Sequence, residues 1–82
     1  MSRVIVMKNG DIVCLESYDW PEYRSLVLIN SAIHELVSKA AACQSRYPGQ
    51  AVRFCFNSEY GEVPQVVKTA LEAQGIVVER WP

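Results

Sequence analysis

Strand-like and helix-like hydrophobic patterns alternate along the second half of the chain, and this alternation sets the class of fold. Val52, Phe54 and Phe56 are separated by single residues, which predicts a strand with one strongly apolar face. Apolar residues at three- and four-residue spacing precede and follow this strand, which predicts an amphipathic helix on each side of it. Strands that alternate with helices indicate βαβ units and parallel strand pairing.

The N-terminal residues predict a β-hairpin. Residues 4–7 and 12–15 are short runs rich in β-branched side chains, and Lys8-Asn9-Gly10-Asp11 separates them. Asn9 and Gly10 supply the two positive-φ positions that a type I′ turn requires. We therefore expect a tight hairpin, in which Asn9 and Gly10 have a turn role and no binding role.

The first helix is predicted from a capping signal and a hydrophobic stripe. With Asp19 as N-cap, Glu22 follows three residues later, as in a capping box, and Pro21 falls in the first turn. The expected helix covers residues 20–46, because Pro48-Gly49 then stops the pattern. Its buried stripe is expected to contain Leu26, Ile29, Ile33, Leu36, Val37 and Ala40.

The length of this helix leaves an alternative open. A helix over residues 20–46 would be about 40 Å long, whereas a compact domain of this size is about 30 Å across. On the continuous helix Val27 and Leu28 point away from the buried stripe and need a partner. In the alternative, residues 24–29 form a third strand and the helix begins with Ser31 as N-cap. We favour the continuous helix because of the cap at Asp19.

The remaining segments complete a two-layer architecture. A second apolar stripe, with Pro64 near its start and Gly75 after its end, predicts another helix, and residues 76–78 predict a last strand. The expected order is β-β-α-β-α-β in one α/β domain over residues 1–82, on the border of the α+β class. An N-terminal hairpin and two right-handed crossovers would place both helices on one face of a four-stranded mixed sheet.

Charge and cysteine usage narrow the class of function. The formal net charge is −1, and the eight basic and nine acidic residues are scattered along the chain, which argues against nucleic-acid binding. Three widely spaced cysteines fit neither a disulfide framework nor a metal knuckle. The apolar runs are too short for a signal peptide or a bilayer span. We therefore expect a soluble cytoplasmic protein with no membrane contact.

Few residues could carry catalysis. His34 is the only histidine, and it is expected on the flank of the first helix. We interpret Cys14, Cys43 and Cys55 as small core residues, with Cys14 and Cys55 on neighbouring strands. The sequence therefore predicts no catalytic residue, no metal site and no cofactor.

A polar loop lies where the central strand meets the second helix. It contains Asn57, Ser58, Glu59, Tyr60 and Gly61. Ligands in parallel sheets tend to bind beyond the carboxyl ends of strands, so these residues are the site of an alternative function as a small enzyme or small-ligand binder. We favour a structural turn, because the loop has a single glycine and no phosphate-binding motif.

Apolar and aromatic residues in excess of the expected core indicate a protein interface. Aromatic side chains are enriched at such interfaces, although in small domains they also cover the ends of a thin core. We expect a small protein-binding module that acts as a regulator or inhibitor and self-associates as a homodimer or binds another protein. The candidate interface residues are Tyr18, Trp20, Tyr23, Val27, Leu28 and Trp81.

Overall fold

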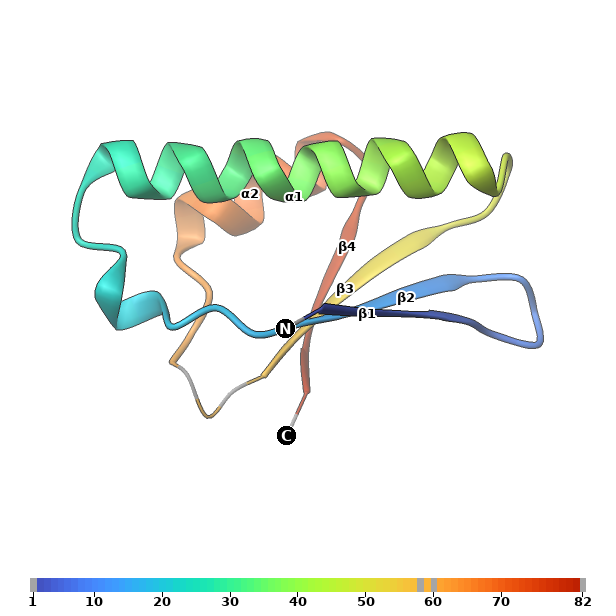
Figure 1. Cartoon of the computed structure of the whole chain (residues 1–82), viewed down its shortest axis with the longest axis horizontal. Coiled ribbons are helices and arrows are strands. Elements are labelled where there is room, and N and C mark those ends of the chain that lie inside the picture. The colour runs from blue at the N-terminus through green and yellow to red at the C-terminus, as the bar shows by residue number, and fades with distance from the viewer. Residues whose placement is uncertain (1, 58, 60, 82) are drawn as a thin grey trace.

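The predicted order of elements is confirmed by the computed structural model, which describes residues 2–57, 59 and 61–81, with the backbone alone at residues 2 and 81 (Figure 1). The elements are β1 (Ser2–Val6), β2 (Ile12–Glu16), the short 3-10 helix η1 (Trp20–Glu22), α1 (Leu26–Arg46), β3 (Val52–Asn57), α2 (Gln65–Ala73) and β4 (Val77–Trp81).

The strands form one mixed sheet in the order β1-β2-β3-β4. β1 pairs antiparallel with β2, whereas β2, β3 and β4 are parallel to one another. Figure 1 shows α1 and α2 on the same side of this sheet. Each crossover moves one strand along the sheet in the same direction, so the two crossovers have the same hand. The fold is the small two-layer α/β sandwich that the sequence predicts.

The hairpin between β1 and β2 forms, but its turn type differs from the prediction. Gly10 has a φ of +91°, and no other residue type has positive φ in the described part of the chain, so a type I′ turn at Asn9 and Gly10 is wrong. The Gly10 N–H donates to the carbonyl of Met7 at 2.9 Å, and the Met7 N–H donates to the carbonyl of Asp11 at 2.8 Å. Only the glycine therefore adopts the left-handed conformation, as in three-residue hairpin loops.

The first helix begins at Leu26, so both interpretations of its start are wrong. Ser25 is the N-cap, and its Oγ accepts a hydrogen bond from the Leu28 N–H at 3.2 Å. Asp19 makes no side-chain capping bond and precedes only the short helix η1. This break resolves the length problem, because α1 has 21 residues and fits within a longest dimension of 36 Å.

The core lies between the sheet and the two helices. Alternate residues of β2 and β3 are buried, together with one stripe of each helix. Leu26 departs from the predicted stripe of the first helix, since it is 75% exposed, and Val66 on α2 is 53% exposed. The buried hydrophobic residues of the helices and their inward-facing strand partners are Ile12, Cys14, Ile29, Ala32, Leu36, Ala40, Val52, Phe54, Phe56, Val67 and Leu71.

By length and composition alone, α1 is apolar enough to cross a membrane. In this fold the helix covers the sheet, and Leu36 in its middle is fully buried in the core. Core helices of globular proteins can be equally long and apolar, but only 22% of the apolar stretch of α1 is buried in this fold. The radius of gyration is 12.3 Å, close to the value of about 12 Å expected for a globular chain of this length. The compact shape is that of a soluble domain.

Candidate functional site

One face of the sheet has no helix over it (Figure 1). Because Val52, Phe54 and Phe56 are buried beneath the helices, Arg53 and Cys55 point to the opposite face. The strand register aligns two rows of side chains on that face. One row is Ile5, Val13, Arg53 and Val77, and the other is Arg3, Leu15, Cys55 and Glu79. We call these residues the open sheet face.

The open sheet face is largely apolar. Val13, Leu15 and Cys55 line an open hollow of about 400 Å³ that Met7 and Asn9 border at the hairpin. Val77 at its far edge is 41% exposed. Parallel strands are normally covered on both faces, because the crossover helices pack there, and strands covered on both faces are apolar on both sides. The uncovered apolar side chains of β2, β3 and β4 therefore form a surface suited to a partner.

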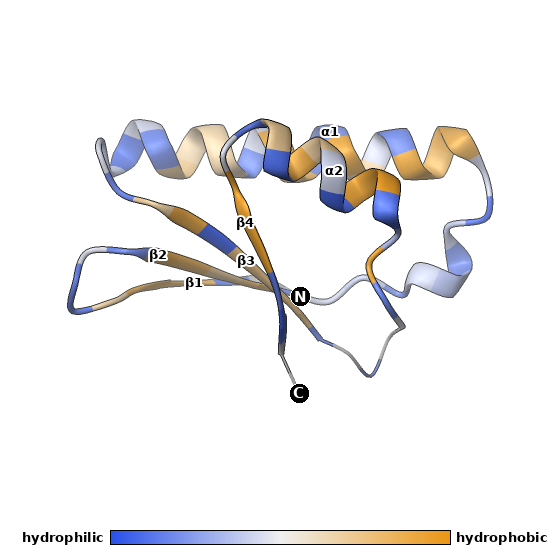
Figure 2. Cartoon of the chain, turned by 180° about the vertical axis from the view of Figure 1, so that it is seen from behind, coloured by the Kyte–Doolittle hydropathy of each residue, from blue (hydrophilic) through white to orange (hydrophobic). Residues whose placement is uncertain are grey.

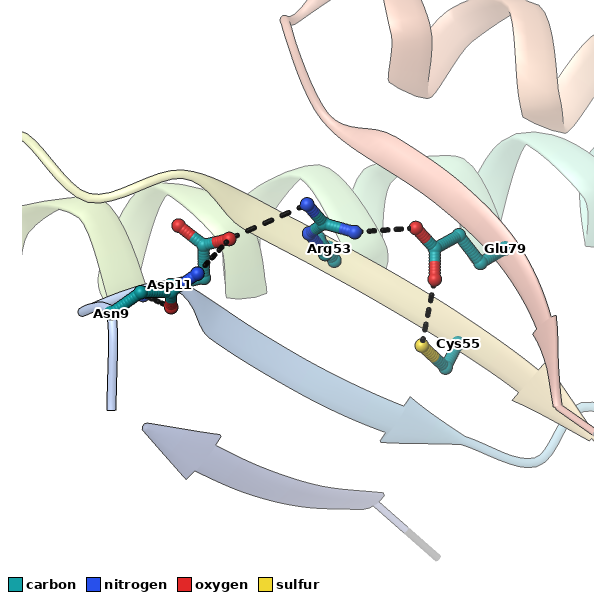
Figure 3. Close-up of polar contacts among 5 residues, drawn as sticks. All are labelled: Asn9, Asp11, Arg53, Cys55 and Glu79. Carbon is teal, nitrogen blue, oxygen red and sulfur yellow. Dashed lines mark hydrogen bonds and ion pairs between the residues drawn. The ribbon is translucent and has the colours of Figure 1, made fainter. Parts of the chain in front are cut away.

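A charged group lies at the centre of this surface (Figure 3). Arg53 donates from Nη1 to Glu79 Oε1 at 2.7 Å, and its Nη2 lies 3.4 Å from Asp11 Oδ2. The Asp11 N–H in turn donates to Asn9 Oδ1 at 3.0 Å, which fixes the hairpin end next to the arginine. The guanidinium is thus held between carboxylates from β4 and the hairpin, and its orientation is set before any partner binds.

Cys55 lies beside this ion pair and is not an activated nucleophile. Its Sγ is 3.9 Å from Glu79 Oε2 (Figure 3). Burial and, to a smaller extent, the charge of Glu79 raise the pKa of the Cys55 thiol, against the opposing effect of Arg53. A thiol with a raised pKa remains protonated at neutral pH and reacts slowly. The chemistry of the open sheet face is therefore that of contact and hydrogen bonding.

The strand-end loop has the geometry of a turn where it is described. Asn57 Oδ1 accepts a hydrogen bond from the Glu59 N–H at 2.9 Å. Gly61 has a φ of +93°, and a Cβ there would lie 3.2 Å from Pro21 Cδ, so the backbone at Gly61 packs closely on η1. Ser58 and Tyr60, which were also candidate ligand contacts, lie outside the described residues. The hydrogen bond of the Asn57 side-chain oxygen is thus the local contact of a turn.

The aromatic residues expected at an interface contact one another instead. Tyr18 and Trp20 stack at 4.9 Å between ring centroids and are only 8% and 5% exposed. Tyr23 packs on Trp20 at 5.2 Å, and Phe56 closes the cluster from β3 at 5.7 Å from Trp20. Tyr18 and Trp20 therefore belong to the core of the monomer and offer little ring area to a partner. The side chain of Trp81 lies outside the described part of the chain.

In the first turn of α1, Val27 and Leu28 point to solvent, as predicted from the helical wheel, whereas Ile29 is buried. Val27 is 77% exposed and Leu28 is 45% exposed, and Leu26 adds to the same turn. Figure 2 shows this end of α1 as a continuous hydrophobic segment. The patch is one helical turn wide, smaller than the open sheet face, and its role at an interface stays a prediction.

A polar cluster at the carboxyl end of β2 was not anticipated. Glu16 is 2% exposed, and its Oε1 accepts a hydrogen bond from Lys39 Nζ at 2.8 Å. Lys39 Nζ also lies 3.4 Å from Glu35 Oε1, which accepts a hydrogen bond from the Tyr18 hydroxyl at 2.8 Å. All of these polar groups have partners within the cluster, so it connects α1 to the sheet.

Sequence reasoning missed the charged residues of the open sheet face as well. Arg53 and Cys55 occupy the alternate positions of β3, and this alternation was the available signal. Their contact with Glu79 depends on the pairing of β3 with β4, which the local pattern does not specify.

Comparison with known proteins gives no guide to the function of this geometry. No protein-family model matches the chain, and neither a curated protein nor a solved structure matches it.

Proposed function

We propose that this chain is a protein-binding module that self-associates by packing its open sheet face against that of a second copy. The observation that carries the proposal is the uncovered apolar face of three parallel strands. Two such faces packed about 10 Å apart would convert two two-layer sandwiches into one four-layer assembly with helices outside and sheets inside. Regulation or inhibition of another protein through this binding stays a prediction.

The charges on the open sheet face fit a second copy as the partner. Arg3 and Arg53 are balanced by Glu79 and by Asp11 at the rim, so the face carries no net charge. Two copies would not repel one another, and Arg3 on the outer strand β1 of one copy can meet a carboxylate of the other. An apolar surface with a few oriented charges is typical of a protein interface.

Binding is better supported than catalysis or nucleic-acid recognition. The described residues contain no group of three or more His, Cys, Asp or Glu placed to hold a metal ion. Lys39, Arg53 and Arg80 each lie within 4 Å of a carboxylate, which reduces the positive charge available to phosphates. The small-ligand alternative at residues 57–61 stays a prediction, because the described contacts of that loop are those of a turn.

The proposal is tested by the solution mass, measured by light scattering over a dilution series. The wild-type chain is expected to be a dimer that dissociates on dilution. Leu15→Asp places a charge in the centre of the open sheet face and should give a folded monomer, with circular dichroism as the check on folding. Because Leu15 is not buried beneath the helices, the substitution leaves the core intact.

Two further variants distinguish the open sheet face from α2 and from the first turn of α1 as the dimer interface. Val66→Asp changes an apolar residue on α2 that is 53% exposed and is expected to leave the dimer unaffected. Leu28→Asp tests whether the first turn of α1 contributes to the dimer, and it is also expected to leave the dimer unaffected. A dimer that only Leu28→Asp dissociates would move the interface to α1, and a wild-type chain that is monomeric at every concentration would contradict self-association.

A further inference from the structure

Two cysteines that are far apart in the sequence meet in the core. Cys14 on β2 and Cys43 on α1 have their Sγ atoms 3.9 Å apart, across 29 residues of chain. Both thiols are free. Each sulfur would move by about 1 Å to reach the bond length of a disulfide. A shift of this size is within the range of side-chain rotation.

The pair has one buried and one accessible member. Cys14 is 2% exposed, whereas Cys43 is half-buried and borders an open hollow of about 310 Å³ between β1 and the end of α1. Val4, Val6, Arg46 and Tyr47 form the other walls of this hollow together with Ala42. A small polar oxidant can therefore reach Cys43 from solvent without opening the core.

Cys55 cannot replace either member. The register pairs Cys55 with Leu15 and pairs Cys14 with Phe54. Cys14 and Cys55 are thus on adjacent strands, as expected, but their side chains lie on opposite faces of the sheet. Cys55 is the matched control that the chain itself provides.

We propose that Cys14 and Cys43 form a reversible modification site, in which a peroxide oxidises the two thiols to an intramolecular disulfide between β2 and α1. This proposal is independent of the proposed binding function, because the hollow beside Cys43 lies on the helix side of the sheet.

The reaction has two balanced steps. The Cys43 thiol loses its proton and the thiolate attacks one oxygen of the peroxide, so an S–O bond forms, the O–O bond breaks and the departing hydroxide takes up that proton as water, which leaves a sulfenic acid on Cys43. The Cys14 sulfur then attacks the Cys43 sulfur, so the S–S bond forms, the S–O bond breaks and the proton of Cys14 leaves with the hydroxide as water. Two thiols lose two electrons, and hydrogen peroxide is reduced to two waters.

The environment of the thiols sets this order of attack. Burial, followed by the nearby Cys43, raises the pKa of Cys14 to about 12. Cys14 is therefore a protonated thiol at neutral pH and does not react with the peroxide itself. It attacks only the oxidised Cys43 sulfur, because that sulfur lies 3.9 Å away and this proximity offsets the small thiolate fraction of Cys14. The disulfide would tie α1 to β2, and a thiol reductant would restore the original pair.

The experiment compares the wild-type chain with Cys14→Ala, Cys43→Ser and Cys55→Ser. Each folded protein is treated with hydrogen peroxide, unfolded with an alkylating reagent present and analysed by mass spectrometry. The wild-type chain and Cys55→Ser should each lose two alkylatable thiols, with the disulfide mapped to Cys14 and Cys43. The other two variants should form no intramolecular disulfide. In the oxidised wild-type chain the melting temperature should rise by about 5 °C or more and return to its starting value with dithiothreitol.

Several outcomes would overturn the proposal. A wild-type chain that keeps all three thiols after peroxide treatment, or that stops at a sulfinic acid on Cys43, has no such site. The same disulfide formed with equal yield in denaturant would show that the fold does not direct the pairing. If Cys14→Ala fails to fold, the Cys43→Ser and Cys55→Ser pair gives the answer, because neither residue is among the fully buried side chains.

Discussion

At the scale of single residues, the Glu16–Lys39 pair is the most consequential contact. The Glu16 carboxylate is almost completely removed from water, and Lys39 Nζ at 2.8 Å is its charged partner. A buried ion pair contributes little net stability, because desolvation offsets the attraction. Losing one partner is costly, since the other charge then stays buried and unpaired. The pair therefore fixes how α1 sits on the end of β2.

Lys39→Met is expected to lower the free energy of unfolding by about 2 kcal/mol, measured by urea denaturation. This is less than the loss of about 3–5 kcal/mol for a fully buried pair, because the Lys39 side chain is 36% exposed and solvent screens part of its charge. Glu35→Gln is the control, since the Glu35 side chain is 57% exposed, and it should change stability by less than about 0.5 kcal/mol. Adding Glu16→Gln to Lys39→Met should recover part of the loss.

Buried protonated groups make the fold sensitive to high pH. Burial raises the pKa of the Cys14 thiol from 9.0 to about 12, and burial together with the hydrogen bond to Glu35 raises the pKa of Tyr18. For Lys39, burial lowers the pKa, but the hydrogen bond to Glu16 and its charge outweigh burial and raise it. In alkaline solution the folded chain therefore holds more protons than the unfolded chain, so stability falls as pH rises.

The expected decline begins near pH 9, where the Cys14 thiol of the unfolded chain ionises, and continues to about pH 12, where the folded thiol ionises. Each such group contributes a slope of at most about 1.4 kcal/mol per pH unit. Urea midpoints measured across this range should fall less steeply in Cys14→Ala than in the wild-type chain. Equal slopes would show that Cys14 does not contribute.

At the scale of elements, the structure differs from the sequence prediction at the start of the first helix, which was predicted at residue 20 and begins at Leu26. Asp19, Pro21 and Glu22 match a capping box, but Tyr18 and Trp20 stack on each other and are buried in the core on either side of Asp19. The chain therefore makes one short helix, η1, and begins again at Ser25. Tertiary packing of the aromatic rings overrides the local capping signal.

Ser25→Ala should lower the free energy of unfolding by about 1 kcal/mol, because it removes the hydrogen bond to the Leu28 N–H. Asp19→Ala is the paired control and should cost less than about 0.5 kcal/mol, since Asp19 makes no side-chain capping bond. Chemical denaturation of both variants gives the comparison. A larger effect at Asp19 than at Ser25 would place the start of the helix where the sequence pattern puts it.

At the scale of the whole molecule, the fold was predictable and the candidate site was not. Strand and helix patterns alternate along the sequence, and the connections between them are short. Few arrangements of the elements satisfy both conditions, and the two-layer sandwich is one of them. The open sheet face depends on which side chains align across β2, β3 and β4, and this register is a tertiary property. The meeting of Cys14 with Cys43 similarly depends on how α1 crosses the sheet.

The two outer strands bring the ends of the described chain to one end of the sheet (Figure 1). Ser2 pairs with Glu16 at the carboxyl end of β2, and Trp81 pairs with Asn57 at the carboxyl end of β3. An affinity tag, a fluorophore or a surface tether attached next to Ser2 or Trp81 will therefore stand beside Asn57 at the carboxyl end of β3. An immobilised chain would present its hairpin tip and the Pro48-Gly49 turn to solution, so ligand screens aimed at residues 57–61 require a chain without tags.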